Sequence, residues 1–279
     1  VGTSADLRLY DIQISKGKKN LSANYSKFSI EDPYEDGRDK QSISLLGVNY
    51  ELQLAKCLSW CLDSNEPDLI ACGLPTGKVV LATFSPPSTT SHGYISPGPK
   101  IIKDFVPKHS RACNCLAWNP VLKNQLAAGL DKVRGDFSTL VWDITYSSSS
   151  SQQNGSPSKA PRTDIKPTSG NTISELANSE ATVALSWIPN APSCLVTGTG
   201  VKWLRIYDLR ADLSAPQSVV AHSKSVHGVK FDPFFPTRLA TFSEDGIIKL
   251  WDIRNFVEPI FSLNSNSKGL VQVEWCPTR

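Results

Sequence analysis

The sequence predicts an all-β fold built from a unit that recurs about every 44 residues. Ala221–Arg254 holds one complete unit: a His-led loop, a strand, an Asp-Pro turn, a second strand, a Gly-containing turn, and a strand ending in Trp-Asp. Strand-ending aromatics recur at Trp187, Phe231 and Trp275, 44 residues apart, within the period typical of WD repeats. Each unit of this type forms one four-stranded blade of a β-propeller.

We expect four whole blades between two partial ones. Residues 1–14 would end a first blade, and residues 265–279 would begin a sixth; the whole blades would be 45–106, 107–146, 172–220 and 221–264. Propeller rings usually close with four to eight blades, so the fold class expected is an incomplete propeller, part of a seven-bladed ring. Because the chain starts at Val1, has no Met and begins and ends inside a repeat, we expect a fragment of a longer protein.

The whole blades differ in how well they keep the repeat. The second has Trp60 as its strand-ending aromatic, but its closing position falls on Ala82–Thr83 and is degenerate. The third has Trp118 and closes at Trp142–Asp143, after a hairpin lengthened by Lys132–Phe137. The fourth and fifth close at Tyr207–Asp208 and Trp251–Asp252, 21 residues from the strand-ending aromatic to the Asp.

Three polar insertions separate these units, at residues 15–44, 85–99 and 147–171. They are rich in Ser together with Pro, Lys, Asp or Gly, and they cannot bury enough apolar surface to offset the entropy of ordering. We therefore predict loops between blades at all three places. A net charge of +3 gives no indication of a nucleic-acid partner. The sequence also has no apolar run near the 18 residues that a transmembrane helix needs.

The seven cysteines indicate core packing. Cys57 and Cys115 stand three residues before a strand-ending Trp, where other units have Ala184 or Gly228. A free Cys at such a position acts as a small hydrophobic residue. The closest pairs, Cys57/Cys61 and Cys113/Cys115, lack the spacing of zinc ligands, so no metal or cofactor is predicted. We expect reduced core thiols in a cytoplasmic protein.

One group of residues could suggest a hydrolase. His222, Ser243 (or Thr241), Asp245 and Trp251 match the hydrogen-bonded network found in many WD blades. The His and Asp would bond each other, and the chain would end at the indole N–H. We expect this set to hold the blade together as a satisfied polar network. The sequence has no G-x-S-x-G motif and no phosphate-binding loop, so we predict a protein that is not an enzyme.

A short basic stretch is the candidate protein-binding site. Lys108 and Arg111 lie in the loop that precedes the first strand of the third blade, beside His109. Loops at that end of a propeller commonly contact partners, so these two side chains could meet an acidic protein surface. The alternative is a loop in contact with solvent alone.

Part of the chain resembles one family more specifically than the general repeat does. Asp104–Ile144 is similar to the third blade of the Mios (missing oocyte) family, above all in Phe105–His109, Cys113–Pro120 and the irregular hairpin Leu126–Lys132 followed by Asp136–Ser138. Gly77–Leu81 and Trp275–Arg279 also agree. The resemblance implies an N-terminal propeller of a large scaffold in the GATOR/SEA complex, which regulates TORC1 signalling in response to amino acids.

The function expected is therefore a non-enzymatic interaction scaffold. Its partners would be other protein subunits, with no small-molecule substrate and no nucleic acid. The resemblance places it in the cytoplasm, recruited to the lysosomal or vacuolar membrane only through partners. The alternative is a WD-repeat adaptor of another pathway, such as a ubiquitin-ligase substrate receptor or a chromatin binder. A catalytic propeller would need acids, bases or metal ligands at the axis, where the sequence places Cys, Ala, Gly and Gln.

Overall fold

The computed structural model describes residues 7–15, 40–49, 52, 54–61, 69–83, 100–145, 172–267 and 269–276. Over these residues it contains four four-stranded antiparallel sheets and one two-stranded hairpin. The one helical element among them is a single 3-10 turn, η1 (Ile253–Asn255). The predicted all-β propeller architecture is confirmed. The insertions at 85–99 and 147–171, and most of that at 15–44, lie outside the described residues.

Each sheet is a meander of four strands that follow one another in the chain. The second blade contains β3 (Cys57–Trp60), β4 (Leu69–Gly73), β5 (Val79–Thr83) and β6 (Lys100–Phe105). The third contains β7 (Cys113–Trp118), β8 (Gln125–Leu130), β9 (Phe137–Asp143) and β10 (Thr172–Asn178). The fourth contains β11 (Thr182–Ile188), β12 (Ala191–Thr199), β13 (Trp203–Asp208) and β14 (Gln217–Val220). The fifth contains β15 (Val226–Phe231), β16 (Arg238–Ser243), β17 (Ile247–Asp252) and β18 (Phe261–Asn264).

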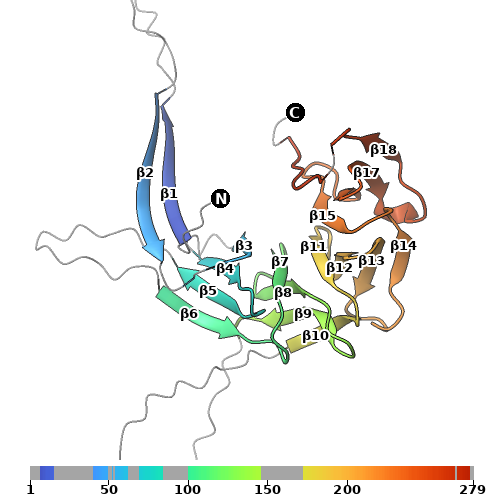
Figure 1. The fold of residues 1–279 in the computed structure, drawn as a ribbon, viewed down its shortest axis with the longest axis horizontal. Helices are drawn as coiled ribbons and strands as arrows, with labels where there is room; N and C mark the ends of the chain where they lie inside the picture. Colours follow the sequence, from blue (N-terminus) through green and yellow to red (C-terminus); the bar gives the residue numbers. More distant parts are fainter. Residues whose placement is uncertain are drawn as a thin grey trace, which may run out of the picture.

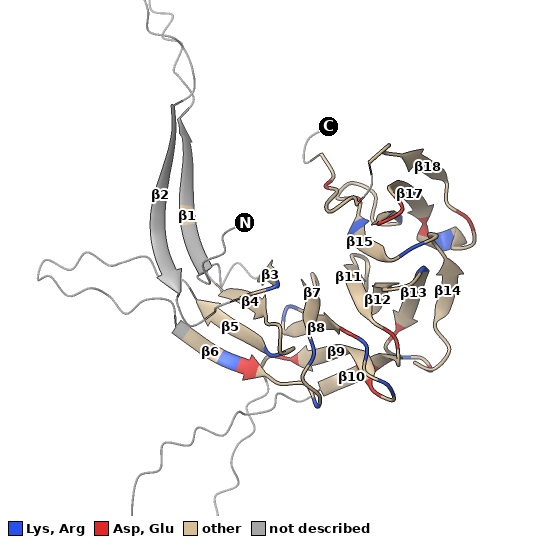
Figure 2. Cartoon of the chain, in the orientation of Figure 1, with Lys and Arg blue, Asp and Glu red and all other residues tan. Residues whose placement is uncertain are grey.

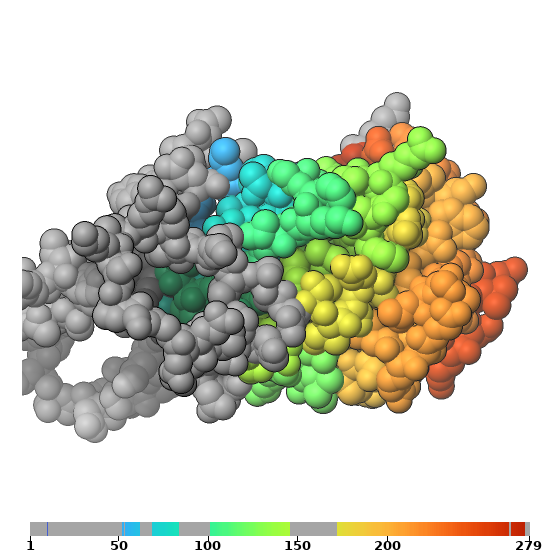
Figure 3. Space-filling view, turned by 90° about the horizontal axis from the view of Figure 1, so that it is seen from below, coloured from blue at the N-terminus to red at the C-terminus, as the bar shows by residue number. Residues whose placement is uncertain are grey.

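The sheets follow one another along an arc, in the order of the sequence. Their first strands lie on the inner side of the arc and their last strands on the outer side (Figure 1). Strand β3 contacts β7, β7 contacts β11, and β11 contacts β15. In the space-filling view, the third, fourth and fifth sheets lie directly beside one another in sequence order (Figure 3). The inner strands therefore form the contacts that pass from one blade to the next.

Two predicted blade boundaries are wrong. We expected residues 172–178 to open the fourth blade, but β10 pairs with β9 and is the outer strand of the third. We also expected the second blade to begin at residue 45, but β2 (Lys40–Asn49) pairs along its whole length with β1 (Leu7–Ser15). In both cases the strand lies at the end of a long polar insertion, and residues 40–44, predicted as loop, belong to β2. Cross-strand hydrogen bonds decide its sheet, and they join residues far apart in sequence.

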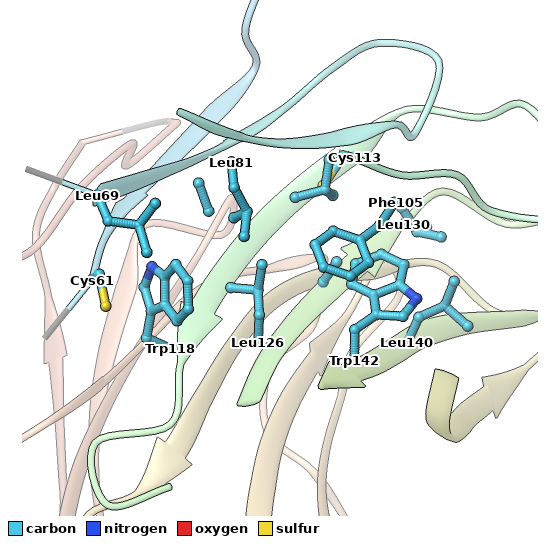
Figure 4. Packing of buried hydrophobic residues seen from close by; sticks show 13 residues of the cluster. Cys61, Leu69, Leu81, Phe105, Cys113, Trp118, Leu126, Leu130, Leu140 and Trp142 are labelled. Atoms are coloured by element: carbon cyan, nitrogen blue, oxygen red, sulfur yellow. The ribbon is translucent and has the colours of Figure 1, made fainter. Parts of the chain in front are cut away.

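The apolar core lies mainly between neighbouring sheets. Phe105 of β6 and Trp142 of β9 stack with ring centroids 5.1 Å apart, and Trp118 packs beside Leu126 in the same cluster (Figure 4). A second cluster surrounds Trp251 in the fifth sheet. Fully burying a side chain of this kind contributes about 1.5–3 kcal/mol. All four strands of a sheet supply residues to these clusters: Trp118 ends the first strand of its sheet, whereas Phe105 and Trp142 lie on an outer and a third strand.

Candidate protein-interaction surface

The fifth sheet contains a buried chain of hydrogen bonds centred on Thr241 of β16. The Trp251 indole donates to Thr241 Oγ1 over 2.9 Å, and the same oxygen lies 2.9 Å from His222 Nε2. Since Thr241 Oγ1 accepts from the indole, its own hydrogen can be donated to an unprotonated Nε2. The other ring nitrogen, Nδ1, lies 3.4 Å from Asp245 Oδ2. The network thus joins the loop before β15 to the turn between β16 and β17.

Asp245 fixes both segments at once. One carboxylate oxygen accepts from the amide and the hydroxyl of Ser223, each at 3.0 Å, and the other accepts from the Ile247 amide at 3.0 Å. Burial alone would raise the pKa of Asp245, but the Ser223 and Ile247 amides and the nearby imidazole outweigh it and lower that pKa. Burial lowers the pKa of His222 to about 4, although Asp245 opposes this shift. At neutral pH the pair is therefore a carboxylate beside a neutral imidazole.

Ser243 is placed differently from the prediction. Its side chain is buried, and its hydroxyl accepts from the Asp245 amide at 3.3 Å. The hydroxyl that contacts His222 belongs to Thr241, the alternative that the sequence left open. The cause is position along the strand, because Thr241 pairs with Val229 whereas Ser243 pairs with Val226 at the end of β16. His222 and Ser243 are thus not arranged as a base and a nucleophile.

The third sheet has a different polar group at the corresponding level. His109 Nδ1 lies 2.8 Å from Asp136 Oδ2, and Arg111 NH1 lies 3.0 Å from the same oxygen. Arg111 also donates to the Phe137 carbonyl. Its backbone is fixed by the second sheet, since the Arg111 amide donates to the Thr76 carbonyl at 3.1 Å. The β4–β5 turn at Thr76 passes close beneath it, through Gly77 with φ of +83°.

These contacts correct the expected role of Arg111. Its side chain is 3% exposed and its guanidinium is used within the blade, so it cannot present a charge to a partner. Lys108 lies on the same loop and is exposed, as are Lys132 and Arg134 on the loop between β8 and β9. The His109–Asp136 contact ties these two loops together. Basic and acidic segments alternate in the loops at this end of the third sheet (Figure 2). We call Lys108, Lys132 and Arg134 the basic loop surface.

A second feature, not predicted, links the blades to one another. The Trp118 indole donates to the Ser59 carbonyl at 3.0 Å, and the Trp187 indole donates to the Ala117 carbonyl at 3.0 Å. The Trp275 indole donates to the Lys230 carbonyl at 3.1 Å. In every case the acceptor immediately precedes the strand-ending aromatic of the previous blade. The recurring aromatics were visible in the sequence, but their hydrogen-bond acceptors depend on how the blades stack.

Trp275 also bears on the predicted start of a sixth blade. Residues 271–276 form no strand, so the expected strand Val271–Trp275 is not present in the described residues. The Trp275 indole nevertheless makes the bond that strand-ending tryptophans make elsewhere, and Glu274 pairs with Lys230 at 2.7 Å. The segment is thus docked on β15 without a ladder of its own.

Over the described residues, no group of three or more His, Cys, Asp and Glu side chains could hold a metal ion. None of the helical segments found there has the length and hydropathy to cross a membrane. The polar groups described above make most of their side-chain hydrogen bonds within their own blades.

A family model described as "MIOS, WD40 repeat" matches residues 37–279. The chain belongs to this family. It is similar to the "GATOR2 complex protein MIOS" of Dictyostelium discoideum, with 44% identity over 94% of this chain and 25% of that protein. The protein of the same name from Danio rerio is 37% identical over 86% of this chain and 27% of that protein. The chain therefore spans about a quarter of the length of these relatives.

A more distant relative and a solved structure agree with this family. The "GATOR2 complex protein Mio" of Drosophila melanogaster is 29% identical over 88% of this chain and 24% of that protein. Among solved structures, a chain of "Crystal Structure of Mitotic Checkpoint Complex" matches with a TM-score of 0.55 and 18% identity. That match covers 84% of this chain and 59% of the other, and at this identity it supports the fold alone. The resemblance to the Mios family inferred from the third blade is confirmed.

Proposed function

We propose that this propeller is a non-enzymatic interaction scaffold in a GATOR2-type complex, and that it serves the regulation of TORC1 by amino acids. The observation that carries the proposal is the family match over residues 37–279, together with relatives named as GATOR2 complex proteins. The protein would act in the cytoplasm and reach the lysosomal or vacuolar membrane through its partners. Its contribution is to hold other subunits in place.

The basic loop surface is our candidate contact with a partner. Arg111 and Asp136 hold the two loops rigidly from within the blade, so Lys108 and Arg134 are presented on a preorganised support. A rigid surface loses less conformational entropy on binding than a flexible one. Two exposed cations beside the Asp136 loop favour a partner surface with exposed carboxylates. Electrostatic complementarity of this kind governs specificity and association rate.

The test is the charge reversal Lys108→Glu with Arg134→Glu, made in the full-length protein. We expect normal accumulation and an unchanged melting temperature, but loss of co-purification with the other subunits and a blunted TORC1 response to amino acids. Arg111 is left unchanged because its replacement would disturb the fold itself.

The matched control reverses two exposed arginines elsewhere, Arg210→Glu with Arg254→Glu. These side chains are 73% and 74% exposed, and each pairs with the Asp two residues earlier, which is the last residue of the preceding strand. Exposed pairs of this type contribute little to stability. If the first double variant still assembles and signals like the control, the basic loop surface is not the interface. If the wild-type protein instead co-purifies with a ubiquitin ligase or with chromatin, the adaptor alternative replaces the proposed function.

A further inference from the structure

Two cysteines from adjacent sheets face each other where the inner strands meet. Cys57 is the first residue of β3 and Cys113 is the first residue of β7, and their sulfur atoms are 3.6 Å apart. A disulfide needs a separation of about 2.05 Å. Closing the gap requires the sulfurs to approach by about 1.5 Å, a distance that side-chain rotation and a small strand shift can supply.

Gly73 of β4 makes room for this sulfur pair. A Cβ atom at Gly73 would lie 2.5 Å from Cys57 Sγ and 2.6 Å from Cys113 Sγ. Any larger residue would therefore force the sulfurs to move. The two cysteines also differ in access, because Cys57 is partly exposed and Cys113 has no exposed surface. A small oxidant in solution can reach Cys57, while Cys113 is shielded behind it.

Local hydrogen bonds also shift the pKa values of the two thiols in opposite directions. The hydrogen bond between the two sulfurs lowers the pKa of Cys57; burial opposes this, while the Gly73 backbone and Lys56 assist it. The same hydrogen bond and burial raise the pKa of Cys113. A thiolate is the nucleophilic form of cysteine, so Cys57 is the member of the pair suited to attack an oxidant.

We propose that Cys57 and Cys113 are an oxidation site at which hydrogen peroxide closes a disulfide between the second and third blades. The Cys57 thiolate attacks one peroxide oxygen, so an S–O bond forms, the O–O bond breaks, and the departing hydroxide takes up a proton to leave as water. The Cys57 sulfenic acid then meets the Cys113 sulfur. The S–S bond forms as the S–O bond breaks, and the Cys113 proton leaves with the hydroxyl group as a second water. One peroxide is reduced and two thiols are oxidised.

The disulfide would join β3 to β7 and close a covalent loop around the whole second sheet. In the reduced protein, contact between these strands is non-covalent and includes the bond from the Trp118 indole to the Ser59 carbonyl. Oxidation would therefore fix the spacing of these two blades, and reduction by a thiol would release it.

The site can be tested on the intact protein with hydrogen peroxide, followed by alkylation, digestion without reductant and mass spectrometry. We expect a peptide that joins Cys57 to Cys113 and disappears on reduction. In Cys113→Ser, a sulfenic-acid trap should label Cys57, since the resolving thiol is missing. In Cys57→Ser, Cys113 should remain reduced at the same peroxide dose.

Cys115→Ser is the matched control, because Cys115 lies two residues from Cys113 on β7 and its sulfur packs against Gly129 instead. This variant should form the Cys57–Cys113 peptide to the same extent as the wild type. The wild-type measurement needs no substitution, so it stands even if a variant folds poorly. The proposal is overturned if peroxide oxidises the exposed Cys276 while Cys57 and Cys113 stay reduced, or if Cys113 is trapped as readily as Cys57.

Discussion

The third and fifth blades use different side chains to fix the loop before their first strand to a turn within the same sheet. Both have a His nine residues before the strand-ending aromatic, His109 and His222. In the fifth blade the imidazole is buried and bonded to Thr241, whereas in the third it is half exposed and contacts Asp136. The difference follows from one strand position. Thr241 pairs with Val229, and the residue paired at the same level of the third blade is Ala128.

An alanine offers no hydroxyl, so the third blade cannot build the chain from imidazole to indole. In the third blade Arg111 makes the contact with the turn instead, and it stands at the position that Lys224 occupies in the fifth blade. Arg111 is buried against Asp136, while Lys224 is exposed and pairs loosely with Glu244 at 3.6 Å. In both blades the loop before the first strand is fixed to the turn between the second and third strands. The residues that make this contact differ from one blade to the other.

The largest effect is expected for Trp251→Ala in the fifth blade. The substitution leaves a cavity, which costs about 3–5 kcal/mol for a large aromatic in a core, and it leaves Thr241 without its donor, at a further cost of about 1–3 kcal/mol. Equilibrium unfolding in denaturant measures the change. Deletion of Ser147–Pro157, which lies outside the described residues, is the control and should leave stability nearly unchanged. Equal losses in both proteins would contradict the role assigned to the indole.

Arg111→Leu in the third blade should destabilise by about 3 kcal/mol, because it removes the partner of a largely buried carboxylate. The side chain of Asp136 is 12% exposed and would keep the His109 imidazole as its side-chain neighbour. The matched change in the fifth blade, Lys224→Leu, should cost less than about 0.5 kcal/mol because Lys224 is exposed. Similar melting temperatures for the two variants would show that Arg111 and Lys224 contribute equally to stability.

Thr241→Val should cost about 2 kcal/mol, since it preserves shape but leaves His222 Nε2 and the Trp251 indole without a partner. The fourth blade supplies the matched control. Thr197 pairs with Leu185 at the same level, is fully buried, and has no hydrogen-bond partner for its hydroxyl. Thr197→Val should therefore be neutral or stabilising. A larger loss from Thr197→Val than from Thr241→Val would refute the network.

The last prediction is a dependence on pH, with an effect about as large as that of Thr241→Val. Burial lowers the pKa of His222 to about 4, against about 6.5 in an unfolded chain. The unfolded state then binds more protons than the folded state between these values, so stability is full above pH 6.5 and falls as pH decreases towards 4. Between pH 7.5 and pH 5 the loss should be about 2 kcal/mol. Denaturation at both pH values measures it, and His222→Gln should flatten the difference. An unchanged difference in that variant would assign the pH dependence to other groups.

The sequence correctly predicted the structural features that recur at a fixed spacing. It predicted the β-propeller, the strand-ending aromatics and the glycine turns, because these depend on local periodicity. It could not show that Arg111 is buried, since burial there depends on the second sheet, whose turn at Gly77 passes beneath it. It also misplaced β10, because an outer strand is assigned by its hydrogen bonds to β9 across a long insertion.

The indole bonds between blades do not extend to every seam of the described arc. They span the second and third blades, the third and fourth, and the fifth blade and the segment ending at Trp275. At the seam between β11 and β15 the corresponding residue is Phe231, whose ring has no N–H to donate. The fourth and fifth blades are therefore joined without an indole bond. Their contact depends on the buried apolar cluster that contains Ala184 and Leu204 of the fourth blade and Val229 of the fifth.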